Sequence, residues 1–157
     1  MIQRKQTIFL LLAVVAYVVC LFLPIGHIVA KGMALDTTVY NLGTVGGNNG
    51  SINIIGTCVP LFILDAVAAL LSVVTIFMYN KRPLQMTLCA VTILFSCLWC
   101  VDYILLFLGL VQIPEVEGEF GMQFGACLPV VGIILVAMAR KGVGDDEKLV
   151  KAADRIR

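Results

Sequence analysis

Two aspartates, Asp65 and Asp102, lie inside otherwise apolar stretches and are the sharpest candidates for chemistry in this chain. A charged aspartate near the centre of a bilayer costs about 3 kcal/mol, so such a side chain normally faces a bundle interior or water. The pair predicts a proton or cation relay, or a polar ligand pocket. The competing interpretation is that both acids reach the outer interface or hydrogen-bond across helices. It is favoured because no intramembrane Lys, Arg or His pairs with them.

Two of the six cysteines, Cys97 and Cys100, have the CxxC spacing of thiol–disulfide chemistry. The pair lies about 20 Å along a helix from Leu84, deep in lipid, where buried thiols are unreactive. Redox catalysis is therefore the least favoured of the functions considered. Cys58 and Cys127 lie toward the outer side, and the sequence leaves open whether they pair.

Other classes of site find little support. His27 is the only histidine, and a lone histidine at a membrane boundary is usually interfacial rather than a ligand or proton sensor. Because this single histidine lies at the membrane boundary, a Ser-His-Asp catalytic triad is also excluded. The net charge of +1 provides no basic field for nucleic acid, and neither zinc-finger spacing nor a phosphate loop is present. We predict no catalytic residue, metal, cofactor or nucleic-acid partner.

The composition places these residues in a membrane protein. The chain is 61% hydrophobic and 13% charged, with a mean hydropathy of +1.02, whereas a soluble domain carries about 25% charge. Each of four apolar runs is long enough to cross about 30 Å of hydrocarbon. Backbone groups in lipid must pair internally, so each run should be a helix. We predict an all-α membrane protein with a four-helix transmembrane bundle, its helices at about 7–28, 57–79, 84–111 and 120–140.

Positive charge predicts the orientation of these helices. Ten of the eleven Lys and Arg residues lie in 1–6, in 80–83 or from Arg140 onward, and only Lys31 lies elsewhere. Because cytoplasmic loops carry the excess of Lys and Arg, both termini and the turn at 80–83 should be cytoplasmic. The loops 29–56 and 112–119 then face outward.

The segments outside the helices have patterns of their own. The outer loop 29–56 holds two β-prone runs, 35–40 and 51–55, with Asn49-Gly50 between them, which predicts a small extracytoplasmic β-hairpin or extended loop. Residues 1–143 form the predicted transmembrane domain. Residues 144–157 form a predicted short cytoplasmic amphipathic helix, with an apolar stripe at Leu149, Val150, Ala153 and Ile156. The alternative for this tail is a solvated, partly frayed segment.

A small-residue motif falls in the outer half of the predicted fourth helix. Gly121 and Gly125 have GxxxG spacing, which favours close helix packing, either within the bundle or between copies in a homo-oligomer.

The two ends of the chain resemble a known family. Residues 1–12 read MIQRKQTIFLLL and residues 146–157 read DEKLVKAADRIR. Both are similar to the ends of a bacterial four-pass membrane family of unknown function, domain-of-unknown-function family 4293. The resemblance implies the inner membrane of a Gram-negative bacterium and brings no activity or catalytic residue. It directs attention to a candidate cytoplasmic interaction surface, formed by Gln3, Arg4, Gln6, Lys148, Asp154 and Arg155. The alternative is that these residues are only topology and capping signals.

Three functions follow in order of preference. The first is a non-enzymatic accessory or scaffold subunit that engages a membrane or cytoplasmic protein at its cytoplasmic face. The second is a small transporter or proton-coupled subunit that uses Asp65 and Asp102. The third is a membrane thiol oxidoreductase that uses Cys97 and Cys100.

Overall fold

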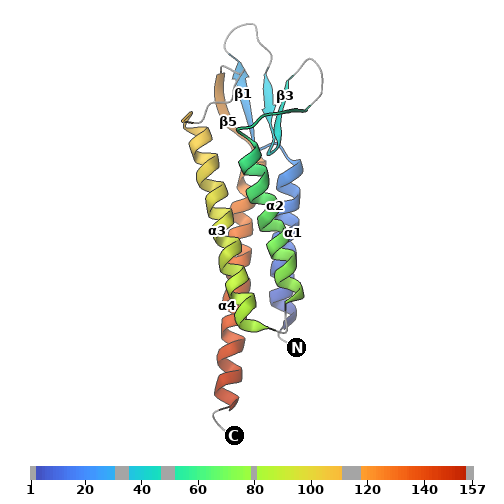
Figure 1. Cartoon of the computed structure of the whole chain (residues 1–157), viewed down its shortest axis with the longest axis vertical. Coiled ribbons are helices and arrows are strands. Elements are labelled where there is room, and N and C mark those ends of the chain that lie inside the picture. The colour runs from blue at the N-terminus through green and yellow to red at the C-terminus, as the bar shows by residue number, and fades with distance from the viewer. Residues whose placement is uncertain (1–2, 31–35, 47–51, 79–80, 111–117, 155–157) are drawn as a thin grey trace.

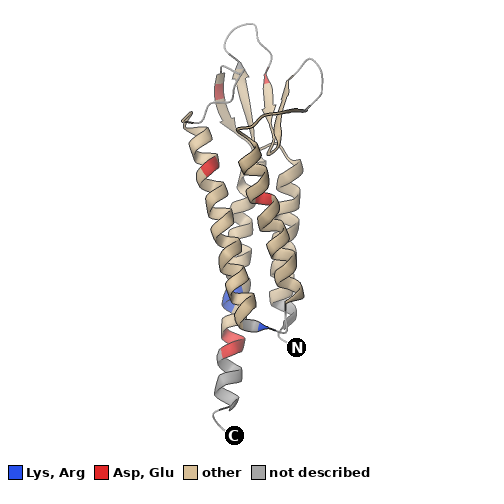
Figure 2. Cartoon of the chain, in the orientation of Figure 1, with Lys and Arg blue, Asp and Glu red and all other residues tan. Residues whose placement is uncertain are grey.

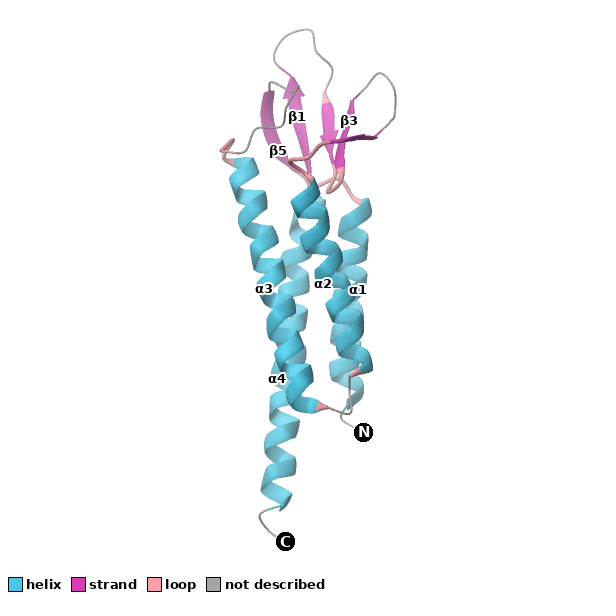
Figure 3. Cartoon of the chain, viewed as in Figure 1, coloured by secondary structure: helices cyan, strands magenta, loops and turns pink. Residues whose placement is uncertain are grey.

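Four helices pack side by side, and a small sheet stands on one end of them (Figures 1 and 3). The computed structural model describes residues 3–30, 36–46, 52–78, 81–110 and 118–154. The chain order of the elements is α1 (Gln3–Phe22), β1 (Gly26–Ala30), β2 (Thr37–Val39), β3 (Gly43–Gly46), β4 (Ile52–Ile54), α2 (Val59–Phe77), α3 (Arg82–Phe107), β5 (Gly118–Met122), the 3₁₀ helix η1 (Phe124–Cys127) and α4 (Leu128–Asp154).

Three helices are long and apolar enough to cross a membrane, over Val59–Phe77, Pro83–Phe107 and Phe124–Glu147. The apolar part of α1, Gln6–Phe22, is shorter. Large apolar side chains are exposed along the outside of the bundle, as they are where lipid rather than water is the solvent. The predicted helices 57–79 and 84–111 correspond to α2 and α3. Both begin with a proline in the first turn, where the missing N–H has no helical partner to lose.

The sheet is antiparallel, with the strand order β4-β3-β2-β1-β5. It overturns the predicted bounds of the first and fourth helices. The run 7–28 leaves the helix after Phe22 and continues as β1, with Pro24 between the two elements. The run 120–140 begins as β5, which pairs with β1 so that Gly26 lies opposite Met122 and Ala30 opposite Gly118. The sequence pattern of a short apolar run fits a helix and a buried strand equally well. Here the pairing between β1 and β5, which are far apart in the sequence, makes both segments strands.

The outer loop forms more strands than the predicted two-stranded hairpin. Its two β-prone runs contain β2 and β4, but these strands do not pair with each other. The strand β3 lies between them and pairs with both, so the segment is a three-stranded meander. Gly43 in β3 permits this pairing because a Cβ there would collide with the backbone of Asn53. The Asn49-Gly50 turn lies outside the described residues.

Up to Asp154, the predicted tail is not a separate helix. Instead, α4 runs without interruption for 27 residues to Asp154, a length of about 40 Å. The expected start of the tail helix, at residue 144, lies within α4. Gly142 and Gly144 do not end α4, since neither has a left-handed backbone and Gly142 faces the Gln6 side chain. The C-terminal part of α4 projects beyond the other helices, at the end where the N-terminus and the α2–α3 turn also lie (Figure 1).

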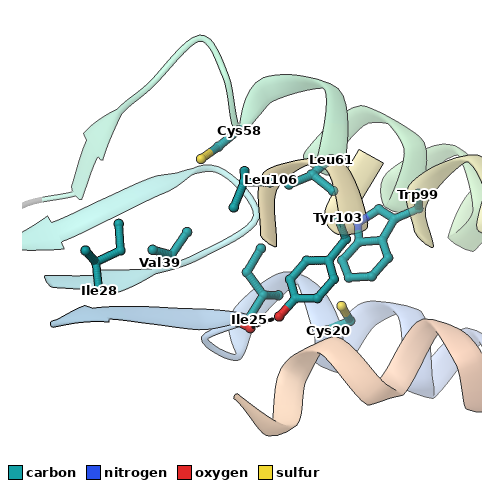
Figure 4. Packing of buried hydrophobic residues seen from close by; sticks show 9 residues of the cluster. All are labelled: Cys20, Ile25, Ile28, Val39, Cys58, Leu61, Trp99, Tyr103 and Leu106. Carbon is teal, nitrogen blue, oxygen red and sulfur yellow. Dashed lines mark hydrogen bonds between the residues drawn. The ribbon is translucent and has the colours of Figure 1, made fainter. Parts of the chain in front are cut away.

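The buried apolar residues form two clusters. One lies where the sheet meets the bundle, and it joins strand residues such as Ile28 and Val39 to Trp99, Tyr103 and Leu106 of α3 (Figure 4). The other lies deeper in the bundle and draws on all four helices, with Leu10, Ala13, Tyr17, Ala68, Ala69, Cys89, Val136 and Ala139. The first cluster includes the hydrogen-bonding side chains of Trp99 and Tyr103.

Candidate functional site

A buried asparagine connects the sheet to the helices. Asn41 lies in the connection between β2 and β3, is fully buried, and points into the end of the bundle. Its Nδ2 donates to the carbonyl oxygen of Cys20 at 2.8 Å, and its Oδ1 accepts from Trp99 Nε1 at 3.1 Å. The Cys20 carbonyl is in the last turn of α1, where carbonyls lack helical partners. One side chain thus satisfies a helix end and the only indole of the chain.

Tyr103 makes a second connection beside the first. Its hydroxyl donates to the carbonyl oxygen of Ile25 at 2.9 Å, just before β1 (Figure 4). Its ring stacks on Trp99, with centroids 5.3 Å apart, and meets Phe120 of β5 edge-on at 6.1 Å. The half of α3 nearest the sheet therefore contacts both the start of β1 and β5.

Asp65 lies in the bundle below this layer. Only 1% of its surface is exposed, and within the described part of the chain neither carboxylate oxygen has a hydrogen-bond partner. The carboxyl group interacts electrostatically with Cys20 and Tyr17 of α1. The small residues Ala68 and Ala69 share its buried face, which brings the neighbouring helices close. An orphaned buried carboxyl group is rare and calls for an explanation.

Asp102 has different surroundings. It is half-buried on α3, its Oδ2 has no hydrogen-bond partner among the described residues, and it interacts electrostatically with Cys58 at the start of α2. Figure 2 shows the acidic positions of α2 and α3 in the half of the bundle nearest the sheet. The two aspartates therefore lie at the same end of the bundle, but Asp65 faces α1 and Asp102 faces the beginning of α2.

A tyrosine–serine pair lies next to Asp65. The hydroxyl groups of Tyr17 and Ser96 are 2.7 Å apart, and Ser96 Oγ also lies 3.0 Å from the carbonyl oxygen of Thr92. Gly132 of α4 makes room for the tyrosine ring, since a Cβ there would lie 2.5 Å from the ring carbon Cζ. Helices α1, α3 and α4 meet at this pair.

All six cysteines are free, so Cys58 and Cys127 do not pair with each other. Of the CxxC pair, Cys97 is exposed on the outside of the bundle and Cys100 is half-buried. Cys20 is fully buried, and its thiol lies 3.5 Å from the carbonyl oxygen of Gly125.

The two GxxxG glycines do not lie together on one helix. Gly121 is in β5, opposite His27 of β1, and the imidazole ring occupies the space where a Cβ of Gly121 would lie. Gly125 is in η1, where a Cβ would collide with the Pro24 carbonyl. The prediction that both glycines lie in the fourth helix was therefore wrong. Both glycines nevertheless allow a close contact, Gly121 with the His27 ring and Gly125 with the Pro24 carbonyl. His27 is half-buried, and its Nδ1 has no partner within the described residues.

The residues of the predicted interaction surface are only partly described. Gln6 is 8% exposed, and its Nε2 donates to Asp146 Oδ2 at 2.7 Å, so it joins α1 to α4. The side chains of Gln3, Arg4, Lys148 and Asp154, and the whole of Arg155, lie outside the described part of the structure. Arg140 and Lys141 are exposed on α4 near the same end.

Sequence reasoning missed the residues that organise this site, which are Asn41, Trp99, Tyr103, Tyr17 and Ser96. One signal was available, since a buried indole N–H usually needs a hydrogen-bond acceptor and the chain has one tryptophan. Over the ranges that the structure describes, no three His, Cys, Asp or Glu side chains are grouped to hold a metal ion.

Comparison with known proteins identifies the family and leaves the activity open. No curated protein matches the chain. The sequence model of one family, a domain of unknown function named DUF4293, matches residues 2–156. The match spans both the helices and the sheet, and includes both chain ends that resembled this family. The protein with the Asn41 connection and the buried Asp65 is thus a member of the DUF4293 family.

Proposed function

We propose that this protein is a four-pass protein of the bacterial inner membrane, with both termini in the cytoplasm, and that it acts as a non-enzymatic accessory or scaffold subunit. Three helices are long and apolar enough to cross the bilayer, and α1 packs against two of them, α2 and α4. With 20 residues, α1 is about 30 Å long, which matches the hydrocarbon thickness. We therefore propose that α1 is a fourth crossing of the bilayer.

The distribution of charge supports the orientation. The described basic residues on α4 and before α3 lie at the end opposite the sheet (Figure 2). The membrane rule counts Lys and Arg near span ends, so this end is the cytoplasmic one. The sheet then stands on the outer surface.

The projection of α4 carries the proposal of a partner at the cytoplasmic end. The Gln6–Asp146 hydrogen bond shows that α1 and α4 are in contact at the level of Asp146. From Asp146 to Asp154, α4 continues for eight residues, or about 12 Å. A regular helix that extends this far past its bundle offers a surface on which a cytoplasmic or membrane protein can dock.

Crosslinking in native membranes tests this proposal. Deleting residues 148–157 leaves Asp146 in place, so the contact with Gln6 survives and only the projecting part is lost. We expect the full-length protein to crosslink to a partner, and the deletion to lose it while still inserting. A sharper comparison removes two positive charges in each of two variants. Lys148→Ser with Arg155→Ser should weaken the crosslink, whereas Lys151→Ser with Arg157→Ser should not. Recovery as a lone monomer, unchanged by the deletion, contradicts the proposal; recovery of a second copy identifies a homo-oligomer.

A small transporter or proton-coupled subunit is the second candidate, and the buried, unpartnered Asp65 favours it. Intramembrane carboxyl groups commonly serve proton or ion pathways. Replacing both Asp65 and Asp102 with Asn should then abolish the phenotype of the gene while leaving insertion intact. A double variant that behaves like the wild type removes this candidate.

A thiol oxidoreductase has the least support, because Cys97 faces away from the bundle while Cys100 is half-buried. The doubly substituted variant Cys97→Ala, Cys100→Ala should retain full function. Loss of function in that variant, with normal insertion, reverses this ranking.

A further inference from the structure

Below the contacts of Asn41, Trp99 and Tyr103 with the sheet lies one buried polar group whose position nothing else in the fold explains. The buried hydroxyl and indole groups around it have partners: Tyr17 with Ser96, Trp99 with Asn41, and Tyr103 with Ile25. Asp65 alone is almost completely buried with neither oxygen partnered in the described part of the chain. We infer that Asp65 is an intramembrane proton-binding site and that it acts without Asp102. This deepens the second candidate function and does not depend on the docking proposal.

The energetics favour a proton on Asp65. A carboxylate that is buried beside no donor stronger than the Cys20 thiol and no paired charge loses most of its hydration without compensation when it is ionised, whereas the neutral acid loses far less. The neutral acid has an O–H donor and a carbonyl acceptor, and the thiol of Cys20 is the polar group that it faces on α1. Binding of a proton is therefore the simplest way to lower the free-energy cost of burying this carboxyl group.

The groups around Asp65 do not supply a counter-charge. From α1 it faces Tyr17 and Cys20, both neutral in their ordinary form. From α3, Cys100 interacts with the same two side chains. Asp102 is a neighbour of Cys58 instead. Within the described ranges, the basic residues lie at the opposite end of the bundle (Figure 2).

The same surroundings argue against a metal cation as the ligand. Hard cations such as Ca²⁺ and Mg²⁺ are held by about six oxygen ligands. Asp65 presents one carboxyl group beside a thiol, and the described residues show no cluster of three metal-ligating side chains. A proton needs only one lone pair of one carboxylate oxygen.

The Asn41 layer separates this site from the outer surface. The Cys20 thiol lies 3.4 Å from Asn41 Nδ2 and 3.5 Å from the carbonyl oxygen of Gly125, so the sulfur is held between a loop of the sheet and η1. Asp65 faces Cys20 from the bundle side.

Infrared spectroscopy of the purified full-length protein tests the inference. A protonated carboxylic acid has a carbonyl stretch above the carboxylate and amide bands, and it shifts in D₂O. Exposed Asp and Glu are ionised at about pH 7, so they do not contribute there. We expect wild type to show this band, Asp65→Asn to lack it, and the matched Asp102→Asn variant to retain it. Raising the pH should remove the band reversibly.

Several results overturn the inference. They are the absence of the band in wild type, its loss in Asp102→Asn instead, and its removal by Na⁺ at constant pH, which assigns the site to a metal cation. If Asp65→Asn does not fold, Asp65→Glu serves in its place, since it keeps the acid and should move the band. The measurement needs no partner, so failure of the docking proposal leaves it unaffected. Wild type can show the band while the double Asn variant keeps the phenotype of the gene. In that case Asp65 binds a proton, but the transport role is wrong.

Discussion

Replacing Asn41 with Ala tests how strongly the sheet is tied to the bundle. The substitution removes two hydrogen bonds at once, the one to the Cys20 carbonyl and the one from Trp99 Nε1. Both remaining partners are buried: Trp99 is 1% exposed and Cys20 is fully buried. Neither can turn to water without opening the end of the bundle.

The magnitude follows from the groups left without partners. A buried donor or acceptor that loses its partner costs about 1–3 kcal/mol. Two such groups, the indole N–H and the Cys20 carbonyl, give an expected loss of about 2–6 kcal/mol in the free energy of unfolding. Asn41→Asp should cost at least as much as Asn41→Ala near pH 7, because it buries an unpaired carboxylate and places one of its oxygens against the Cys20 carbonyl oxygen.

The assay uses the tryptophan itself. The chain has one tryptophan, so its fluorescence reports on this contact without further labelling. In detergent, Asn41→Ala should change the Trp99 emission in the folded state and lower the midpoint of denaturant unfolding. The matched control is Asn53→Ala, which makes the same substitution at an exposed position in β4.

The reasoning is refuted if Asn41→Ala destabilises the protein no more than Asn53→Ala and leaves the emission unchanged. A double-mutant cycle with Trp99→Phe, followed by circular dichroism, isolates the pair. Its coupling energy should be about 0.5–3 kcal/mol, the range for residues in direct contact.

Three further predictions concern the helices. Gly132→Ala should lower the unfolding midpoint, at a cost of about 1–3 kcal/mol, because the added methyl group displaces the Tyr17 ring. The matched control in the same helix is Gly144→Ala. Its methyl group meets only a side-chain atom at 3.7 Å, so this change should be neutral or stabilising. Ser96→Ala should cost about 1–3 kcal/mol, because it orphans the tyrosine hydroxyl, and Tyr17→Phe should cost less, because the serine keeps its bond within α3; equal midpoints for the two variants contradict this. Gln6→Ala should cost about 1 kcal/mol by the same measurement, through loss of its hydrogen bond to α4, and an unchanged midpoint shows that the bond contributes nothing.

The sheet illustrates where sequence reasoning stops. The β-prone runs around Asn49-Gly50 indicated strands in the outer loop, and β2 and β4 are found within them. The pairing of β1 with β5 was not predictable, because it joins residues about ninety positions apart, and both strands lie in apolar runs that also suit a helix. Local propensity carries no information about a partner that distant.

The polar site shows the same division. Asp65 was recognisable in the sequence because an acid within an apolar run is costly wherever it lies. Its companions were not, since the Trp99–Asn41 bond spans 58 positions and the Tyr17–Ser96 contact spans 79. Whether a polar side chain finds a partner is a property of the packed structure.

The sequence by itself determined that this chain carries long apolar helices with its basic residues on one side of them, because hydropathy and charge act through composition over a local stretch. It also carried the family likeness of the two chain ends. Only the tertiary structure decided that two of the apolar runs divide into a helix and a strand, that α4 continues as one helix beyond the bundle, and that Asp65 lies without a described partner while Asp102 faces elsewhere. These features depend on contacts between distant residues, which no local pattern encodes.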